Sequence, residues 1–154
     1  MARIVSIAFS PPTETPRPPD HFHRVAASQA TLVADRGIEG DRKGRGGDRQ
    51  LNFMSAETLA ALRAEGFKTG PGEMGEQIVV EGFDVNHLAA GTRIRMGVSA
   101  CVEVVSPRSG CDRFEIIQGQ AKRLVRGRLG VMVRVVADGP IAVGDAVAIK
   151  DWNS

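Results

Sequence analysis

Apolar residues along the chain come in short runs broken by Gly, Pro and Asp, a pattern typical of β-strands joined by turns. We expect strands at residues 2–9, 25–33, 51–54, 77–80, 92–96, 101–105, 131–136 and 146–149. At 92–96 the alternation would place Arg93 and Arg95 on one face and Ile94 and Met96 on the other. This strand and the one at 101–105 form a hairpin candidate.

One segment carries helix signals instead. Ser55 is expected at the N-cap, Glu57 lies in the first turn, and Gly66 marks the end. Leu59 and Leu62 share one face at helical spacing.

A second helix is expected over residues 120–128, where four side chains are basic: Lys122, Arg123, Arg126 and Arg128. Such a face could contact a phosphate, although a charged helix face is more often simply exposed to solvent.

Many short strands with few helices favour a mostly β fold, a closed or partly open β-barrel with two or three short helices. Residues 1–154 are expected to form a single domain. The stretch 10–20 holds five of the eight prolines and is expected to leave the sheet as an excursion. Asp138, Gly139 and Pro140 are interpreted as a turn between the last two strands.

Composition says more about the cellular compartment of the protein than about its function. No apolar run approaches the roughly 18 residues that cross a bilayer, and the first apolar run is too short for a signal peptide. We therefore expect a cytoplasmic protein with reduced thiols and no membrane partner. The net charge of +2 is too small to argue for nucleic acid, but the excess of Arg over Lys suits an anion site.

Cys111 is the strongest candidate for chemistry. It lies in a polar loop sequence between Arg108 and Arg113, and nearby positive charge favours the thiolate, which acts as a nucleophile or as a soft-metal ligand. The alternative is that this cysteine packs as a small apolar residue. Cys101 lies in an apolar strand and is expected in the core, without a disulfide to Cys111.

The Gly-rich segment 37–50 is a candidate anion cradle. It contains two Asp-Arg pairs, namely Asp41 with Arg42 and Asp48 with Arg49. Backbone N–H groups and guanidinium groups together could hold an anion, but the segment is not a P-loop. The alternative is a long turn with solvated ion pairs.

Two other sets of titratable residues are not favoured as functional sites. The three histidines, two of them at His21 and His23, have no clustered partners that would complete a zinc site. Glu73 and Glu76 could be paired carboxylates, but two acids in a turn are more often solvated.

The order of these motifs is more specific than any one of them. It resembles the MOSC domain, named for the C-terminal domain of molybdenum cofactor sulfurase, and a stand-alone bacterial-type member without the pyridoxal-phosphate desulfurase domain. The segments that carry the resemblance are GIEGDR at 37–42, DRQL at 48–51, SAETLAALRAEG at 55–66, PGEMGEQI at 71–78, GTRIRMG at 91–97 and SPRSGC at 106–111.

The resemblance implies a barrel like that of pyruvate kinase, with Cys111 as the functional thiol. In the family this cysteine is proposed to carry sulfur or to ligate molybdenum. Molybdopterin would be bound by basic and polar groups around it, for which this sequence offers Arg108, Arg113, Arg42, Arg49, Asp41, Asp48, Gly75 and Gln77. The chain departs from the family pattern at Lys43, where many members have His, and at Gln77, where many have Asn.

Three functions follow as hypotheses. The first is a molybdenum-cofactor-binding or sulfur-carrier protein that uses Cys111, as a sulfur transferase or as a component of a molybdenum-dependent oxidoreductase. The second is reductive detoxification of N-hydroxylated compounds with an electron-donor partner. The third is a non-enzymatic barrel that binds polyanions, for which few aromatic platforms are available. A cysteine desulfurase or an electron-transfer reductase is the expected partner.

Overall fold

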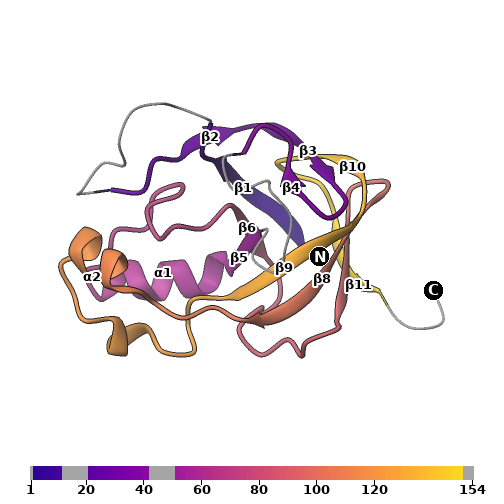
Figure 1. Cartoon of the computed structure of the whole chain (residues 1–154). Helices are drawn as coiled ribbons and strands as arrows, with labels where there is room; N and C mark the ends of the chain where they lie inside the picture. Colours follow the sequence, from indigo (N-terminus) through magenta and orange to yellow (C-terminus); the bar gives the residue numbers. More distant parts are fainter. Residues whose placement is uncertain (1, 12–20, 42–50, 151–154) are drawn as a thin grey trace.

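The computed structural model describes residues 2–11, 21–41 and 51–150, and strands dominate it (Figure 1). The strands are β1 (Arg3–Phe9), β2 (Val25–Ala27), β3 (Gln29–Val33), β4 (Gly37–Ile38), β5 (Leu51–Ser55), β6 (Ile78–Glu81), β7 (Arg93–Met96), β8 (Ala100–Pro107), β9 (Val131–Ala137), β10 (Gly139–Ala142) and β11 (Val147–Lys150). The helices are α1 (Ala56–Ala64), α2 (Asp112–Gln118) and the short 3₁₀ helix η1 (Lys122–Val125). The mostly β class with two or three short helices is therefore confirmed.

The strands form two sheets. The larger has the order β11-β7-β8-β9-β5-β6-β1-β2, and the smaller has the order β10-β3-β4. All pairings are antiparallel except β5 with β6, which α1 connects as a crossover helix. The expected barrel is not confirmed, because the large sheet is open. An isolated bridge between Arg3 and Ala146 links its β1 side to the segment before β11, and Ile4 N donates to Asp145 O over 2.9 Å.

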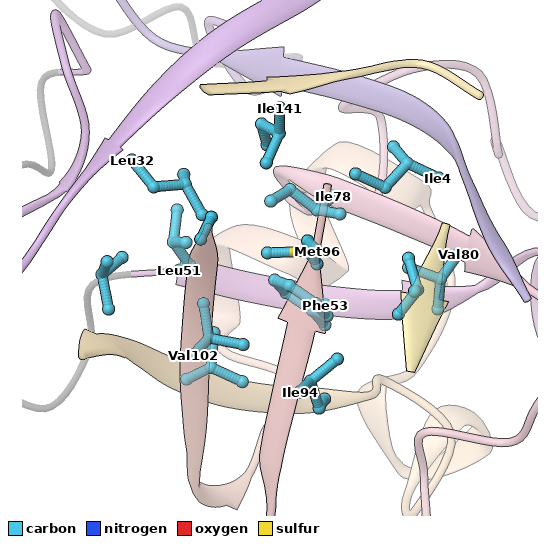
Figure 2. Packing of buried hydrophobic residues seen from close by; sticks show 14 of the residues in the cluster. Ile4, Leu32, Leu51, Phe53, Ile78, Val80, Ile94, Met96, Val102 and Ile141 are labelled. Atoms are coloured by element: carbon cyan, nitrogen blue, oxygen red, sulfur yellow. The ribbon is translucent and has the colours of Figure 1, made fainter. Parts of the chain in front are cut away.

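Apolar side chains from both sheets share one interior. Figure 2 shows Leu32 and Ile141 of the small sheet pointing toward the same space as Phe53 and Ile94 of the large sheet. All four are almost completely buried. Burial of one such side chain contributes about 1.5–3 kcal/mol, so this interior holds the two sheets together.

A second apolar cluster places the helices. The buried face of α1, Leu59 and Leu62, packs in one cluster with Phe67 and Phe114, whose ring centroids lie 6.4 Å apart. The predicted shared face of Leu59 and Leu62 is confirmed, and it is buried. Because Phe114 belongs to α2, the same cluster fixes the position of the helix that follows Cys111.

The hairpin and its two faces are also confirmed. Strands β7 and β8 pair antiparallel, Ile94 and Met96 are buried, and Arg93 and Arg95 are exposed.

Ser55 does not cap α1 with its side chain, although it occupies the N-cap position. Its hydroxyl donates to Phe83 O over 3.0 Å and accepts from Val85 N at 3.0 Å. The predicted N-cap position is confirmed, but the side-chain capping bond is absent because the loop after β6 competes for the same hydroxyl.

The predicted helix over 120–128 is also wrong. Gly119, with φ of 69°, ends α2, and Gly127, with φ of 76°, follows shortly afterwards. Only the four residues of η1 are helical between them, since left-handed backbone cannot continue an α-helix.

The predicted turn at Asp138, Gly139 and Pro140 is wrong in part, because β10 begins at Gly139. Pro140 is tolerated there because β10 lies at the edge of the small sheet.

Gly130 offers a test of close backbone packing. Its φ is 74°, and a Cβ added there would lie 1.8 Å from Phe53 O. Gly127 has nearly the same φ, 76°, but no atom within 4 Å of an added Cβ. We expect Gly127→Ala to cost about 1 kcal/mol of unfolding free energy from backbone strain alone. Gly130→Ala should cost about 3 kcal/mol, from strain and overpacking together. Urea denaturation measures both, and equal costs would contradict the close approach.

Candidate functional site

Cys111 lies in the short connection between β8 and α2, and its thiol is free and exposed. It occupies the N-cap position of α2, where its carbonyl accepts from Glu115 N at 3.2 Å. Cys101 is buried in β8, which confirms its assignment to the core. The two cysteines therefore differ as expected, and only Cys111 is open to a metal, an electrophile or a partner protein.

The local backbone keeps Cys111 at the surface. Arg108 N donates to Gly130 O over 3.0 Å, which continues the pairing of β8 with β9 past Pro107. A Cβ at Gly110 would lie 2.9 Å from the Cβ of Lys122, so η1 packs closely against this connection. Phe114 then anchors α2 in the second apolar cluster.

A cation lies beside the thiol. Lys122 Nζ is 2.8 Å from Asp112 Oδ1, and Lys122 N donates to Glu115 Oε2 over 2.9 Å. The hydrogen bond to Asp112 is the main cause that raises the pKa of Lys122, and Glu115 and Cys111 contribute further. The ammonium of Lys122 is thus within electrostatic reach of Cys111.

The two arginines that flank Cys111 in sequence lie against the same small group of residues. Arg113 Nη2 donates to His21 O over 3.0 Å, and its guanidinium lies 5.5 Å from the centroid of the Phe22 ring. A Cβ at Gly75 would lie 2.6 Å from Arg108 Nη2 and 3.1 Å from Phe22 Cζ. Gly75 therefore leaves room for both the guanidinium of Arg108 and the ring of Phe22.

Arg24 is a third guanidinium in this region, and sequence reasoning missed it. Its Nε donates to Gly75 O over 3.2 Å. Burial lowers the pKa of Arg24, while the carboxylates of Asp41 and Glu76 raise it and Arg113 lowers it further. Arg24 is thus close in space to several site candidates. Nothing in its own stretch of sequence indicates this.

Glu76 is buried, so the expectation that it is solvated is wrong. Its carboxylate accepts from Gly72 N at 2.9 Å and from Met74 N at 3.1 Å, so it holds the turn before β6. Burial raises the pKa of Glu76, and Arg108 is among the groups that lower it.

Two of the predicted site residues, Asp41 and Gln77, are in contact. Asp41 Oδ1 accepts from Ser10 N at 3.1 Å, and its Oδ2 accepts from Gln77 Nε2 at 3.1 Å. Gln77 Oε1 accepts from Asn52 N at 2.8 Å. The side chains of Asp41 and Gln77, with the backbone N–H groups of Ser10 and Asn52, form a buried polar network that links the end of β1, β5 and the start of β6.

Three of the predicted site residues, Arg42, Asp48 and Arg49, lie outside the described residues. Their part in the site stays a prediction, as does that of Lys43.

A pocket of about 380 Å³ is lined by one of the three arginines, Arg24. Its lining consists of His21, Phe22, Arg24, Lys68, Pro71, Gly72, Glu73 and Ile117. The size suits a small ligand or one end of a larger one. Across residues 2–11, 21–41 and 51–150, no three His, Cys, Asp or Glu side chains are grouped so that they could hold a metal ion. None of the helices in this part of the chain is long and apolar enough to span a membrane.

The polar network can be tested by truncating Asp41. Asp41→Ala removes the acceptor of Ser10 N and of Gln77 Nε2 in a buried place, which we expect to cost about 1–3 kcal/mol of unfolding free energy. Glu39→Ala, at an exposed position two residues earlier, should change stability by less than about 0.5 kcal/mol. Urea denaturation of both variants is the measurement. A loss in Asp41→Ala no larger than in Glu39→Ala would show that the network is energetically neutral.

Solved structures share the whole fold. The YUAD protein from Bacillus subtilis superimposes with a TM-score of 0.76 at 20% identity, over 96% of this chain and 94% of that one. YiiM from Geobacillus stearothermophilus gives a TM-score of 0.76 at 17% identity, over 98% and 76% of the two chains. YiiM from Escherichia coli gives 0.71 at 19% identity, over 97% and 70%.

No curated protein matches the chain. Pyridoxal phosphate, associated with the family only through the desulfurase domain, finds no support in these similarities. The family model of the MOSC domain matches residues 23–148, which span β2 to β11 and include Cys111 and every described arginine of the site. The chain therefore belongs to the MOSC domain family, which is associated with proteins of the molybdenum cofactor.

Proposed function

We propose that this protein binds the molybdenum cofactor or handles its sulfur, and that the Cys111 thiolate is the reacting group. The observation that carries the proposal is the exposed free thiol of Cys111 between β8 and α2. A thiolate is a soft donor suited to a sulfur-rich metal centre, and it can also accept sulfur as a persulfide. Membership of the MOSC family supports the same chemistry.

The described residues fit a cofactor that brings most of its own metal ligands. They contain no cluster of three or more His, Cys, Asp or Glu that could hold a metal, so Cys111 would be a single protein ligand. The molybdenum cofactor supplies sulfur ligands from its pterin and, when bound, would provide two-electron redox chemistry. In our proposal Cys111 holds the metal, and the arginines orient the anionic part of the cofactor.

The arginines have donors for this task. Arg24 uses Nε for Gly75 O, and Arg113 uses one Nη2 hydrogen for His21 O. A guanidinium has five N–H donors, so each of these two retains donors for a phosphate or a carboxylate. Arg24 lines a pocket of about 380 Å³, which supports a small anionic group as the ligand there.

Sulfur carriage is the second candidate, and the exposure of Cys111 favours it. A carrier thiol must be reached in turn by the donor and by the acceptor. Reductive detoxification of N-hydroxylated compounds would be one use of the metal-loaded form, together with an electron-donor protein.

Removal of the thiol tests both candidates. Protein purified from a host that makes molybdopterin should contain molybdenum with pterin, or sulfane sulfur, and Cys111→Ala should lose it. Cys101→Ala is the matched control, because Cys101 is buried in β8. Metal analysis, pterin fluorescence and cyanolysis measure the three contents. Equal contents in the wild type and in Cys111→Ala would contradict the proposal.

Replacement of Arg113 separates cofactor binding from sulfur carriage. Arg113→Gln should weaken pterin retention about 10-fold, the value of one charge-assisted hydrogen bond of roughly 1.5 kcal/mol. Sulfane sulfur on Cys111 should not change. Arg95→Gln, on the exposed face of β7, is the control. Pterin retention in Arg113→Gln equal to that of the control would remove Arg113 from the proposed site.

A further inference from the structure

The side-chain amide of Asn52 on β5 is buried, and its oxygen receives no hydrogen bond. Asn52 is 3% exposed. Its Nδ2 donates to Met132 Sδ over 3.8 Å, while its Oδ1 has no donor among the residues that the structure describes. A thioether is a weak acceptor, so the amide gains little from this contact. A buried carbonyl oxygen without a donor destabilises a fold, and its presence needs a reason other than stability.

Asn52 belongs to a row of side chains that crosses three strands of the large sheet. The register pairs Asn52 of β5 with Met132 of β9, and Met132 with Ser106 of β8. Residues that are directly opposite on neighbouring strands point to the same face of a sheet. The hydroxyl of Ser106, the thioether of Met132 and the amide of Asn52 therefore stand side by side.

This row lies on the sheet face that α2 covers. In β5, Phe53 points into the interior between the two sheets, whereas Met54 belongs to the second apolar cluster together with Phe114 of α2. Side chains alternate along a strand, so Asn52 points to the same side as Met54. Met132 is buried on that side but is a member of neither apolar cluster. The row thus marks the place where apolar packing on this face gives way to polar groups.

A β-bulge brings Ser106 into the row. The register of β8 with β9 shifts between Val104 and Ser106, where β8 has one residue more than its partner strand. Val104 points into the interior between the sheets, and regular alternation would turn Ser106 the same way. The extra residue turns Ser106 to the opposite face, beside Met132. Bulges commonly aim a side chain at a functional site in this manner.

The row lies at the end of the sheet that Arg108 crosses. Arg108 follows Ser106 by two residues, at the end of β8. A Cβ at Gly75 would lie 2.6 Å from Arg108 Nη2, so this guanidinium reaches the segment before β6. Strands β9 and β5 lie between β8 and β6. Gln77, two residues after Gly75, accepts from Asn52 N at 2.8 Å through its Oε1. Asn52 therefore lies at the same end of the sheet as the arginine site.

Resting on the proposed binding of the molybdenum cofactor, we infer that Asn52 Oδ1 accepts a hydrogen bond from an N–H group of the pterin ring. Guanidinium groups have donors and no acceptors, so the arginines recognise only the anionic part of the cofactor. A pterin ring also carries uncharged N–H groups, and these need an acceptor. Asn52 supplies one, and the thioether of Met132 beside it is a polarisable contact for a ring. Asn52 thereby favours a pterin over a plain phosphate or carboxylate.

A second asparagine shows what a purely structural amide does in this fold. Asn86 Nδ2 donates to Thr58 Oγ1 over 3.1 Å, and its Oδ1 accepts from Gly130 N at 2.9 Å. Both ends of that amide hold protein groups in place. Asn52 has one weak contact and one unused oxygen, so its polar group contributes little to folding. Residues that serve binding at the expense of stability have this character.

The test compares Asn52→Leu, which removes the acceptor at nearly constant size, with Asn86→Leu, which makes the same change at the satisfied amide. Each protein is purified from a host that makes molybdopterin, and the release of pterin after dilution is followed by fluorescence. We expect Asn52→Leu to release pterin at least about 5-fold faster than the wild type, which corresponds to one hydrogen bond of roughly 1 kcal/mol. Asn86→Leu should release it at the wild-type rate.

Urea unfolding of cofactor-free protein gives a second readout. The midpoint for Asn52→Leu should equal or exceed that of the wild type, because a buried unpaired oxygen is removed. The midpoint for Asn86→Leu should fall. A lower midpoint for Asn52→Leu with release at the wild-type rate would assign Asn52 to the fold and overturn the inference.

Asn52→Ala separates the hydrogen bond from a packing fault, since it removes the amide without adding a branched side chain. It should also release pterin faster than the wild type. Fast release from Asn52→Leu but not from Asn52→Ala would mean that leucine obstructs the site, and the hydrogen bond would be wrong. Release at the wild-type rate from both variants would overturn the role of Asn52 and leave cofactor binding standing. Absence of pterin from the wild type would overturn the proposed cofactor, and the role of Asn52 with it.

Discussion

The side chain and backbone of Gln77 hold together the part of the molecule on which the site depends. Its backbone is hydrogen-bonded to Ala8 and Asn52, and its side-chain amide is hydrogen-bonded to Asn52 and Asp41. The segments of Ala8, Asp41 and Asn52 are thereby joined to the segment of Gln77 itself. The turn that holds Glu76 and Gly75 comes immediately before it. A buried amide that uses both its donor and its acceptor specifies one arrangement of its neighbours, since any shift would leave a polar group unpaired.

The candidate site is assembled from segments that are distant in sequence. Arg24 comes from the segment before β2, Arg108 follows β8, and Arg113 lies in α2. What brings them together is packing outside the site, because the apolar cluster around Phe114 fixes α2 and the polar network fixes the turn at Gly75. The Cys111 thiol itself makes few demands on the fold. Its position is a consequence of how the helix after it is anchored.

Sequence reasoning succeeds where a structural property is local. The alternation of β7 and the shared face of the α1 leucines depend on spacing within one element, so both are predicted correctly. It fails where a distant partner decides the outcome. Ser55 bonds to the loop after β6 instead of its own helix, and Arg24 meets Gly75 across 51 positions. Cys111 is identified from a setting that is polar and irregular within a few residues. The pocket that Arg24 lines is built from segments distant in sequence, so it is not predictable from any one of them.

The bond between Ile4 and Asp145 has a consequence for how the protein forms. The first strand can make this contact only after almost the entire chain has been synthesised, because its partner lies just before the last strand. Contacts of such long sequence separation slow folding, since the entropy of closing the large loop is lost before the contact stabilises anything. During synthesis the apolar side chains of β1 therefore remain without part of their final surroundings until the segment before β11 has been made.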